Sequence, residues 1–238
     1  MIKVLQNWGE VGDSVLSIQR LGLPLHSTAQ KNWDHAILLS ELKSVRHDSP
    51  IIDLGCDEGF TLNFLKLAGY EDLYGLDLNI SWRARAAQLV RMWRRRSLKP
   101  PYHLGRASIT QTPFEAGRFA AAFSVSTIEH GVEKPAFLKE AARILKPGGL
   151  LFVTTDYWQE RIPTPESFRA YGQSWEIACR DDIAQFLKSA AAVGLSPRAS
   201  CEIPDCSQRT VRWGDAEYTF IAMLFRKDDG ATCEQSSR

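Results

Sequence analysis

The fold is decided at residues 51–59, which read IIDLGCDEG. Ile51, Ile52 and Leu54 predict a short buried strand, and the glycines that follow predict a turn that opens a helix. Gly55 and Gly59 let the backbone approach a ligand closely, and the helix start offers unpaired N–H groups and a positive dipole end. The stretch therefore predicts a strand, a turn and a helix built around an anionic group such as a carboxylate.

A second strand with an acidic end follows about twenty residues later. Residues 74–78 read YGLDL and place Asp77 where the strand finishes. From this position a carboxylate accepts hydrogen bonds from both ribose hydroxyls of an adenosine. The pair of elements predicts a nucleoside site.

Strand and helix patterns alternate from about residue 50 onward, which indicates a parallel sheet covered on both faces. The expected strands are 51–54, 73–76, 102–104, 120–125, 150–155, 198–203 and 218–225. The expected helices are 32–42, 60–68, 82–96, 134–145 and 181–193. We expect residues 1–48 to form a helical lid segment, residues 49–227 the main domain, and residues 228–238 a disordered tail.

Composition favours a single soluble domain. The 238 residues are 44% hydrophobic and carry a formal net charge of +1, so no global field draws the protein toward nucleic acid or membrane. No apolar run reaches the roughly 20 residues that span a bilayer, and the first residues lack a signal pattern. Five dispersed cysteines suggest reduced thiols. We expect a cytoplasmic protein without a membrane partner; its oligomeric state is not indicated.

Four motifs in order resemble the class I methyltransferases, and more closely their type 11 group. They are DLGCDEG at 53–59, GLD at 75–77, SVSTIEH at 124–130 and LKPGGLL at 145–151. The resemblance implies an α/β fold, a Rossmann-like three-layer α/β/α sandwich with a seven-stranded, mostly parallel sheet whose last strand is antiparallel. It also implies S-adenosylmethionine as the cofactor.

The resemblance assigns cofactor roles by position. Asp53 and the turn of Gly55, Cys56, Asp57 and Gly59 would face the methionine portion, Asp77 the ribose and Leu78 the adenine. Ser124, Val125 and Ser126 would line the floor beneath the sulfonium.

The chain departs from the pattern of this group at two places. Asp57 replaces the usual third glycine of the turn, which is tolerable because Asp adopts left-handed backbone conformations more readily than most residues. The acid that often follows the third strand is absent. Ser108, next to Ile109, or a backbone carbonyl would then contact the adenine.

Methyl transfer from a sulfonium needs alignment of the reactants, and a base only for a weakly acidic acceptor. His130 follows the fourth strand, where it either removes a proton from the acceptor or simply caps the turn. Glu129 and Asp156 offer oxygen ligands for Mg²⁺, although such carboxylates are more commonly solvated, and we predict no metal.

The acceptor wall is expected at the same sheet edge, where ligands of open α/β sheets bind. Glu129, Asp156, Tyr157 and Trp158 are the candidates there. Trp33, with His26, would close over the site from the helical segment, unless Trp33 is simply buried. These side chains favour a small polar acceptor, methylated on a hydroxyl oxygen of a sugar or natural product.

Other functions stay open. An N-methyltransferase fits the same motifs, and the arginines of residues 83–96 would suit RNA, although such a run is usually a solvated face. A nicotinamide dehydrogenase is disfavoured because Asp57 and Phe60 stand where its fingerprint has glycines. A catalytically silent cofactor-binding partner is also compatible with the fold.

Overall fold

A computed structural model describes residues 1–94, 96, 100–164, 169–170, 172–199 and 201–229. The helices are α1 (Trp8–Arg20), α2 (Lys31–Leu42), α3 (Phe60–Leu67), α4 (Trp82–Arg94), α5 (Lys134–Ile144) and α6 (Arg180–Ala192). The strands are β1 (Ile2–Val4), β2 (Ile51–Leu54), β3 (Leu73–Asp77), β4 (His103–Arg106), β5 (Phe119–Val125), β6 (Leu145–Tyr157), β7 (Arg169–Ala170), β8 (Gln173–Ser174), β9 (Leu195–Pro197), β10 (Val211–Trp213) and β11 (Ala216–Lys227).

The main sheet has the strand order β1-β11-β6-β5-β2-β3-β4, with β9 and β10 also paired to β11. Strands β2 to β6 run parallel, and β11 is antiparallel to β6. The order reverses between β2 and β5, and at such a switch point the carboxyl ends of the strands form a crevice. The predicted fold class is confirmed.

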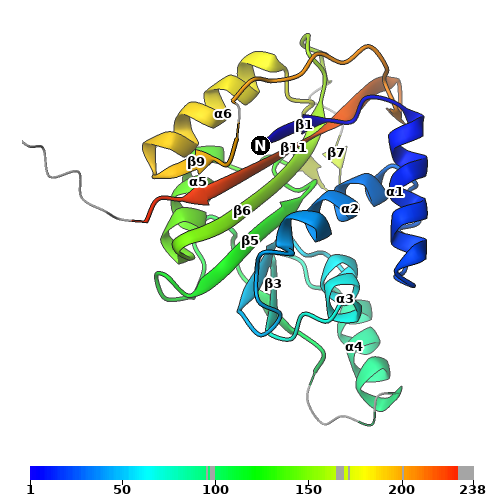
Figure 1. Ribbon diagram of the computed structural model, residues 1–238, viewed down its shortest axis with the longest axis vertical. Coiled ribbons are helices and arrows are strands. Elements are labelled where there is room, and N and C mark those ends of the chain that lie inside the picture. The colour runs from blue at the N-terminus through cyan, green and yellow to red at the C-terminus, as the bar shows by residue number, and fades with distance from the viewer. Residues whose placement is uncertain (95, 97–99, 165–168, 171, 200, 230–238) are drawn as a thin grey trace, which may run out of the picture.

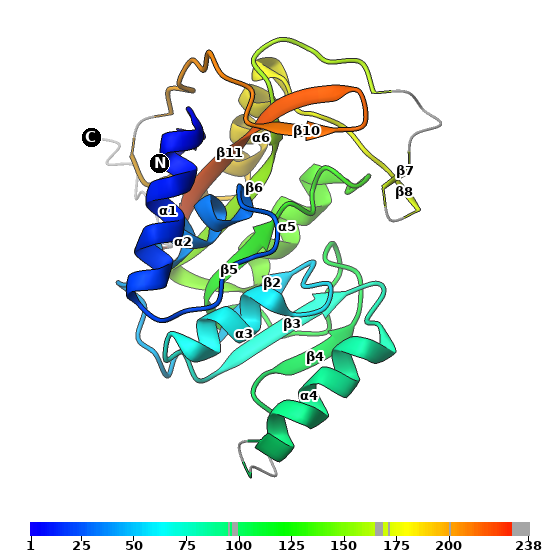
Figure 2. The same ribbon diagram turned by 90° about the vertical axis from the view of Figure 1, so that its right-hand side faces the viewer.

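Helices cover both faces of this sheet. Helices α1 to α4 lie on one side, and α5 and α6 lie on the other (Figures 1 and 2). Every residue of β2 is buried, as expected for a strand covered on both faces, and this explains why its sequence is a continuous apolar run apart from Asp53. Helix α5 begins where the Glu133 side chain accepts a hydrogen bond from the Ala136 amide (2.6 Å).

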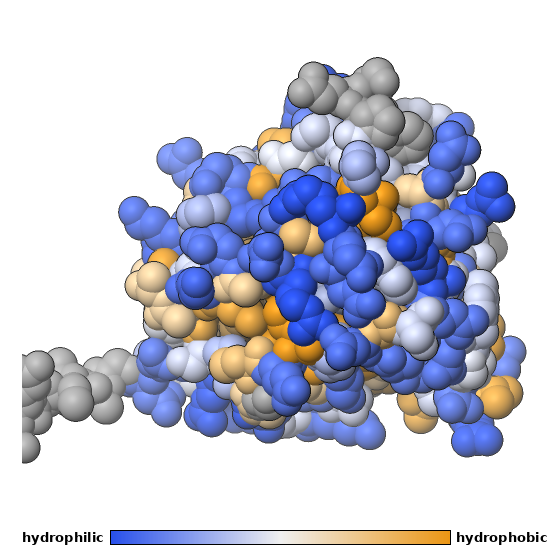
Figure 3. All heavy atoms as spheres, turned by 90° about the horizontal axis from the view of Figure 1, so that it is seen from above, coloured by the Kyte–Doolittle hydropathy of each residue, from blue (hydrophilic) through white to orange (hydrophobic). Residues whose placement is uncertain are grey.

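The face seen from above in Figure 3 is covered largely by hydrophilic side chains, with apolar ones showing between them. No helix among the described residues is long and apolar enough to cross a membrane.

One expected strand is wrong. Residues 198–203 were expected to extend, but the described residues of this range are irregular, and the strand β9 comes earlier, at Leu195–Pro197. It pairs antiparallel with Phe225 to Lys227 of β11. The position of β9 is therefore set by its partner, because local strand propensity alone does not fix where a ladder forms.

The first 48 residues are joined to the sheet. Strand β1 pairs with Ile221 to Met223 of β11, and α1 and α2 pack against each other. Strand β1 and helix α1 were not expected from the sequence. At the other end, Asp228 donates its amide to the Gly194 carbonyl (2.9 Å), and residues 230–238 of the expected tail lie outside the described residues.

Candidate active site

The glycine turn after β2 has the backbone that the sequence predicts. Gly55, Asp57 and Gly59 all have positive φ, at 94°, 42° and 76°. Asp57 thus takes the left-handed conformation that a third glycine would otherwise supply. Gly59 stands at the N-cap of α3, so the turn opens directly onto a helix N-terminus.

The carboxylate of Asp77 lies against this turn. It accepts hydrogen bonds from the backbone amides of Asp57 (3.0 Å) and Asn79 (2.8 Å). The next residue, Leu78, has 53% of its surface exposed although it is apolar. An oriented carboxylate beside an exposed apolar side chain fits the ribose and the adenine face of a nucleoside.

Strands β2 and β5 are joined beneath the turn. The Ser124 hydroxyl donates to the Leu54 carbonyl (2.8 Å), and the Thr127 hydroxyl donates to the Gly55 carbonyl (3.3 Å). A Cβ atom on Gly55 would lie 2.2 Å from Thr127 Cγ2, so only glycine fits at this position. Ser126, with φ of 48°, follows Val125 at the end of β5.

The remaining residues predicted to bind the cofactor are placed as follows. Asp53 is buried, and burial together with the Asp77 charge raises the pKa of its carboxyl group. Cys56 is buried as well, and burial raises the pKa of its thiol. The Ser108 hydroxyl lies 2.8 Å from that of Thr110 in a local turn, and Ile109 is buried.

A buried acid cluster, consisting of Asp34, Glu129 and Asp156 around Lys31, occupies the carboxyl ends of β5 and β6. All three carboxylates are at most 4% exposed. Lys31 Nζ lies 3.6 Å from Asp34 and contacts the Ser126 hydroxyl. The start of α2 thus meets the floor of the predicted cofactor site, although Lys31 and Ser126 are 95 positions apart in the sequence.

Hydrogen bonds fix two members of this cluster. Glu129 accepts from the Thr155 hydroxyl (3.1 Å), and Asp156 accepts from the indole of Trp175 (2.8 Å) and from the Tyr218 hydroxyl. Among the described residues, neither carboxylate oxygen of Asp34 has a hydrogen-bond partner, and its ion-pair partner is Lys31.

Burial shifts the titration of this cluster. It raises the pKa of Asp34 to about 6, and burial together with the Asp156 charge raises the pKa of Glu129 to about 8. The pKa of Asp156 is raised mainly by burial, while Lys31 opposes each of these shifts. Near pH 7 the cluster therefore retains protons that exposed carboxyl groups would have lost.

His130 follows Glu129 at the same edge. Burial, and then the charge of Lys31, lowers the pKa of its imidazole to about 4. The ring is therefore neutral at pH 7, which is the protonation state that a general base requires. No group of three or more His, Cys, Asp or Glu side chains within the described residues is arranged to hold a metal ion.

Three other residues predicted to contact the acceptor, Tyr157, Trp158 and Trp33, are all buried. Tyr157 is adjacent to Asp156 on a strand, so it points to the other face of the sheet. Burial raises the pKa of its hydroxyl, and the charges of Arg180 and Asp205 shift this pKa in opposite directions. Trp158 is buried with the Arg209 guanidinium 4.4 Å from its ring centroid. Trp33 lies in the core, whereas His26 packs edge-on against Phe60.

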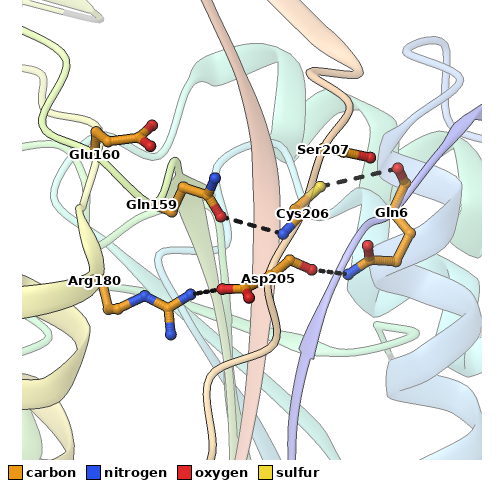
Figure 4. Close-up of a pocket in the computed structure, with 7 residues that line it drawn as sticks. All are labelled: Gln6, Gln159, Glu160, Arg180, Asp205, Cys206 and Ser207. Atoms are coloured by element: carbon orange, nitrogen blue, oxygen red, sulfur yellow. Dashed lines mark hydrogen bonds and ion pairs between the residues drawn. The ribbon is translucent and has the colours of Figure 1, made fainter.

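A surface pocket of about 620 Å³ is lined by residues that include Gln6, Gln159 and Arg180 (Figure 4). Arg180 pairs with Asp205, the Gln6 amide donates to the Asp205 carbonyl (3.1 Å), and the Cys206 amide donates to Gln159 (3.3 Å). Its polar lining is largely engaged in these contacts. None of the residues predicted for the cofactor or the acceptor lines it.

A comparison with known protein families shows which kind of domain the glycine turn resembles. A family model described as a methyltransferase domain matches residues 52–153, the range from β2 to β6 that carries the turn, Asp77 and Ser126. Residues 52–153 thus match a methyltransferase domain. The predicted resemblance is confirmed, as is S-adenosylmethionine as the cofactor with which such domains work.

The curated relatives match this chain over only part of their own length. The chain is 26% identical over 140 residues to (+)-O-methylkolavelool synthase of Herpetosiphon aurantiacus, covering 59% of this chain and 48% of the relative. It is 29% identical over 105 residues to the chloroplastic tocopherol O-methyltransferase of Arabidopsis thaliana, covering 44% and 29%. The chain thus spans less than half the length of these relatives.

Among solved structures, the fold is similar to geranyl diphosphate C-methyltransferase from Streptomyces coelicolor A3(2), which was crystallised with Mg²⁺, geranyl diphosphate and S-adenosyl-L-homocysteine. The TM-score is 0.60 at 18% identity, and the match covers 87% of this chain and 86% of that one. At this identity the likeness shows the fold alone.

The sequence analysis did not predict that Lys31, Asp34 and Tyr218 belong to the candidate active site. A signal for the first two was present, because Lys31 and Asp34 are three residues apart and so share one side of α2. Tyr218 gave no comparable signal, since it stands in an ordinary strand pattern and reaches Asp156 only through the pairing of β11 with β6.

Proposed function

We propose that this protein transfers a methyl group from S-adenosylmethionine to a hydroxyl oxygen of a small molecule. The observation that carries the proposal is the contact of Asp77 with the glycine turn, because it joins an oriented carboxylate to a helix N-terminus. Asp77 would accept the ribose hydroxyls, Leu78 would cover the adenine, and the backbone from Gly55 to Gly59 would hold the methionine end. The cofactor, when bound, supplies a methyl group that is already activated on a sulfonium.

The acceptor side is supported by the buried acid cluster and His130. A neutral imidazole removes a proton from a hydroxyl acceptor, and the proton-holding carboxyl groups of Glu129 and Asp156 orient polar groups in a buried site. Both curated relatives are named for O-methylated products or O-methylation, which favours oxygen over nitrogen as the acceptor atom.

An amine is the second candidate acceptor. The cluster holds three buried carboxyl groups against a single Lys31, so an ammonium group entering it would find acids to pair with. An amine acceptor would need these acids to ionise, and their raised pKa values oppose that. We therefore place oxygen first.

The first test is calorimetric titration of S-adenosylmethionine and, separately, NADH into the wild type and Asp77→Ala. We expect the methyl donor to bind and the variant to lose most of that binding. Binding of NADH alone, or of neither, would overturn the proposal. A panel of phenols, alcohols and amines then follows, with the methylated atom assigned by NMR, and transfer to nitrogen alone would replace oxygen with the amine. Binding without turnover of any acceptor would favour a silent cofactor-binding partner.

A further inference from the structure

Helix α4 turns its large apolar side chains outward. Trp82, Leu89 and Trp93 are 74%, 65% and 80% exposed, and Val90 is half exposed. Their spacing along α4 places them on one side of the helix, where they form a stripe. We call Trp82, Leu89, Val90 and Trp93 the α4 stripe.

The side of α4 that faces the sheet is less apolar than the α4 stripe. Gln88 is partly buried and donates from its side-chain amide to the Tyr102 carbonyl (2.7 Å). Ala87 and Met92 are also partly buried. A helix that only covers a sheet buries its largest apolar residues, so α4 has the reverse of the usual arrangement. An exposed apolar stripe of this kind marks a site of interaction with a partner or a membrane.

Positive charge surrounds the α4 stripe. Arg83, Arg85 and Arg96 are exposed, and the Arg83 guanidinium lies 5.7 Å from the Trp82 ring centroid. Between Leu78 and Phe114 the sequence has eight Arg and Lys residues and no Asp or Glu, so the rest of the chain holds more acids than bases. The near-neutral net charge of the chain therefore hides a strongly basic segment.

We infer that α4 docks this protein onto an anionic phospholipid surface. A helix with Trp and Leu on one side and arginines beside them lies in the interface of a bilayer, where indole rings sit at headgroup level and cations meet lipid phosphates. Such a helix does not span the membrane, so the absence of a spanning helix among the described residues does not bear on it.

Charge complementarity decides among the occupants. A second copy of this chain packed through α4 would bring two sets of arginines together, which is repulsive. RNA would meet the arginines and stack bases on Trp82 and Trp93, but it would leave the aliphatic Leu89 and Val90 between them without a partner, because these offer no stacking surface. Only an anionic lipid surface uses both the apolar stripe and its cations.

The place of α4 in the fold suits this role. Both ribbon views put α4 at the end of the molecule farthest from α6 (Figures 1 and 2), and Figure 2 shows it beside the edge strand β4. Helix α4 also begins shortly after Asp77 and Leu78. Docking would leave the rest of the sheet free while holding its cofactor-binding edge near the bilayer.

The test is co-sedimentation of the purified full chain with vesicles of phosphatidylcholine, with and without phosphatidylglycerol. We expect binding to the anionic vesicles, weakened by salt, and little binding to phosphatidylcholine alone. Trp82→Ala combined with Trp93→Ala should lower binding about tenfold or more, and Arg83→Gln combined with Arg85→Gln should do so only on anionic vesicles. The matched control is Trp8→Ala, a half-exposed tryptophan on α1.

These side chains are exposed, so the variants should fold, and circular dichroism checks that they do. Equal binding of wild type and both double variants would overturn the inference, as would no binding to anionic vesicles. Binding of poly(U) RNA without vesicle binding would assign the surface to nucleic acid instead. A dimer that dissociates in the Trp variant, again without vesicle binding, would assign it to a second copy of the chain.

Discussion

The backbone amide of Asp57 donates a 3.0 Å hydrogen bond to the carboxylate of Asp77, which ties the turn after β2 to the end of β3. This contact orients the carboxylate toward the helix N-terminus of α3. It gives the turn and the acid a common function, and each can be tested separately.

Removal of the Asp77 carboxylate should weaken cofactor binding. Asp77→Ala loses two charge-assisted acceptor positions, which we expect to lower the affinity for S-adenosylmethionine by about 2–4 kcal/mol, or roughly 30- to 1000-fold. Calorimetry measures this. Asp13→Ala, an exposed acid on α1, is the control and should bind as the wild type does. Unchanged affinity in Asp77→Ala would show that the ribose is held elsewhere.

A side chain at Gly55 should destabilise the fold. Gly55→Ala combines a positive φ with a Cβ atom 2.2 Å from Thr127, and we expect a loss of about 2–4 kcal/mol in the free energy of unfolding. Gly22→Ala isolates the backbone part, because Gly22 also has a positive φ but no atom within 4 Å of the added Cβ, and about 1 kcal/mol is expected there. Urea denaturation compares the two. Equal losses would show that Thr127 moves aside.

The stability of the protein should fall as the pH rises toward 8. Glu129 keeps its proton in the folded state up to a pKa of about 8, whereas in the unfolded chain it loses it near 4.5. The folded state therefore binds more protons between these values, and its stability declines across that window. Glu129→Gln should lose the Glu129 part of this decline, which we expect to be about 1–3 kcal/mol, and keep a smaller decline from the other buried acids, whose pKa values are also raised.

Urea denaturation across this pH range measures the decline in the wild type and Glu129→Gln. The exposed Glu115→Gln serves as control and should keep the wild-type decline. A pH profile of Glu129→Gln that parallels the wild type would mean that Glu129 ionises normally.

His130 should govern the rate and leave cofactor affinity alone. Because burial and Lys31 lower the pKa of its imidazole to about 4, the loss of activity on acidification should come near pH 4 and not near 6.5. With an acceptor found by screening, His130→Gln should lower kcat about 10²- to 10⁴-fold and lose this acidic limb, while the Kd for S-adenosylmethionine stays the same. The exposed His103→Gln is the control. A full rate in His130→Gln would leave His130 with a structural role.

Strands and turns were predicted best where the sequence pattern that specifies them lies within a short stretch of the chain. The apolar run of β2, the glycines of the turn and the position of Asp77 all lie within short stretches, and the structure forms them where expected. Strand β9 was misplaced because its pairing with β11 joins segments about thirty residues apart. Strand β1 was missed because its partner Ile221 to Met223 lies at the far end of the chain.

The sequence by itself determined the turn and its chemistry, since a left-handed backbone and a carboxylate at a strand end depend only on which residues stand there. Only the tertiary structure decided that Lys31 and Asp34 meet Glu129 and Asp156, because the contact of Lys31 with Ser126 spans 95 positions. It also decided that α4 turns Trp82 and Trp93 away from the sheet. An amphipathic pattern shows that a helix has two sides, but packing against the sheet chooses which of them is buried.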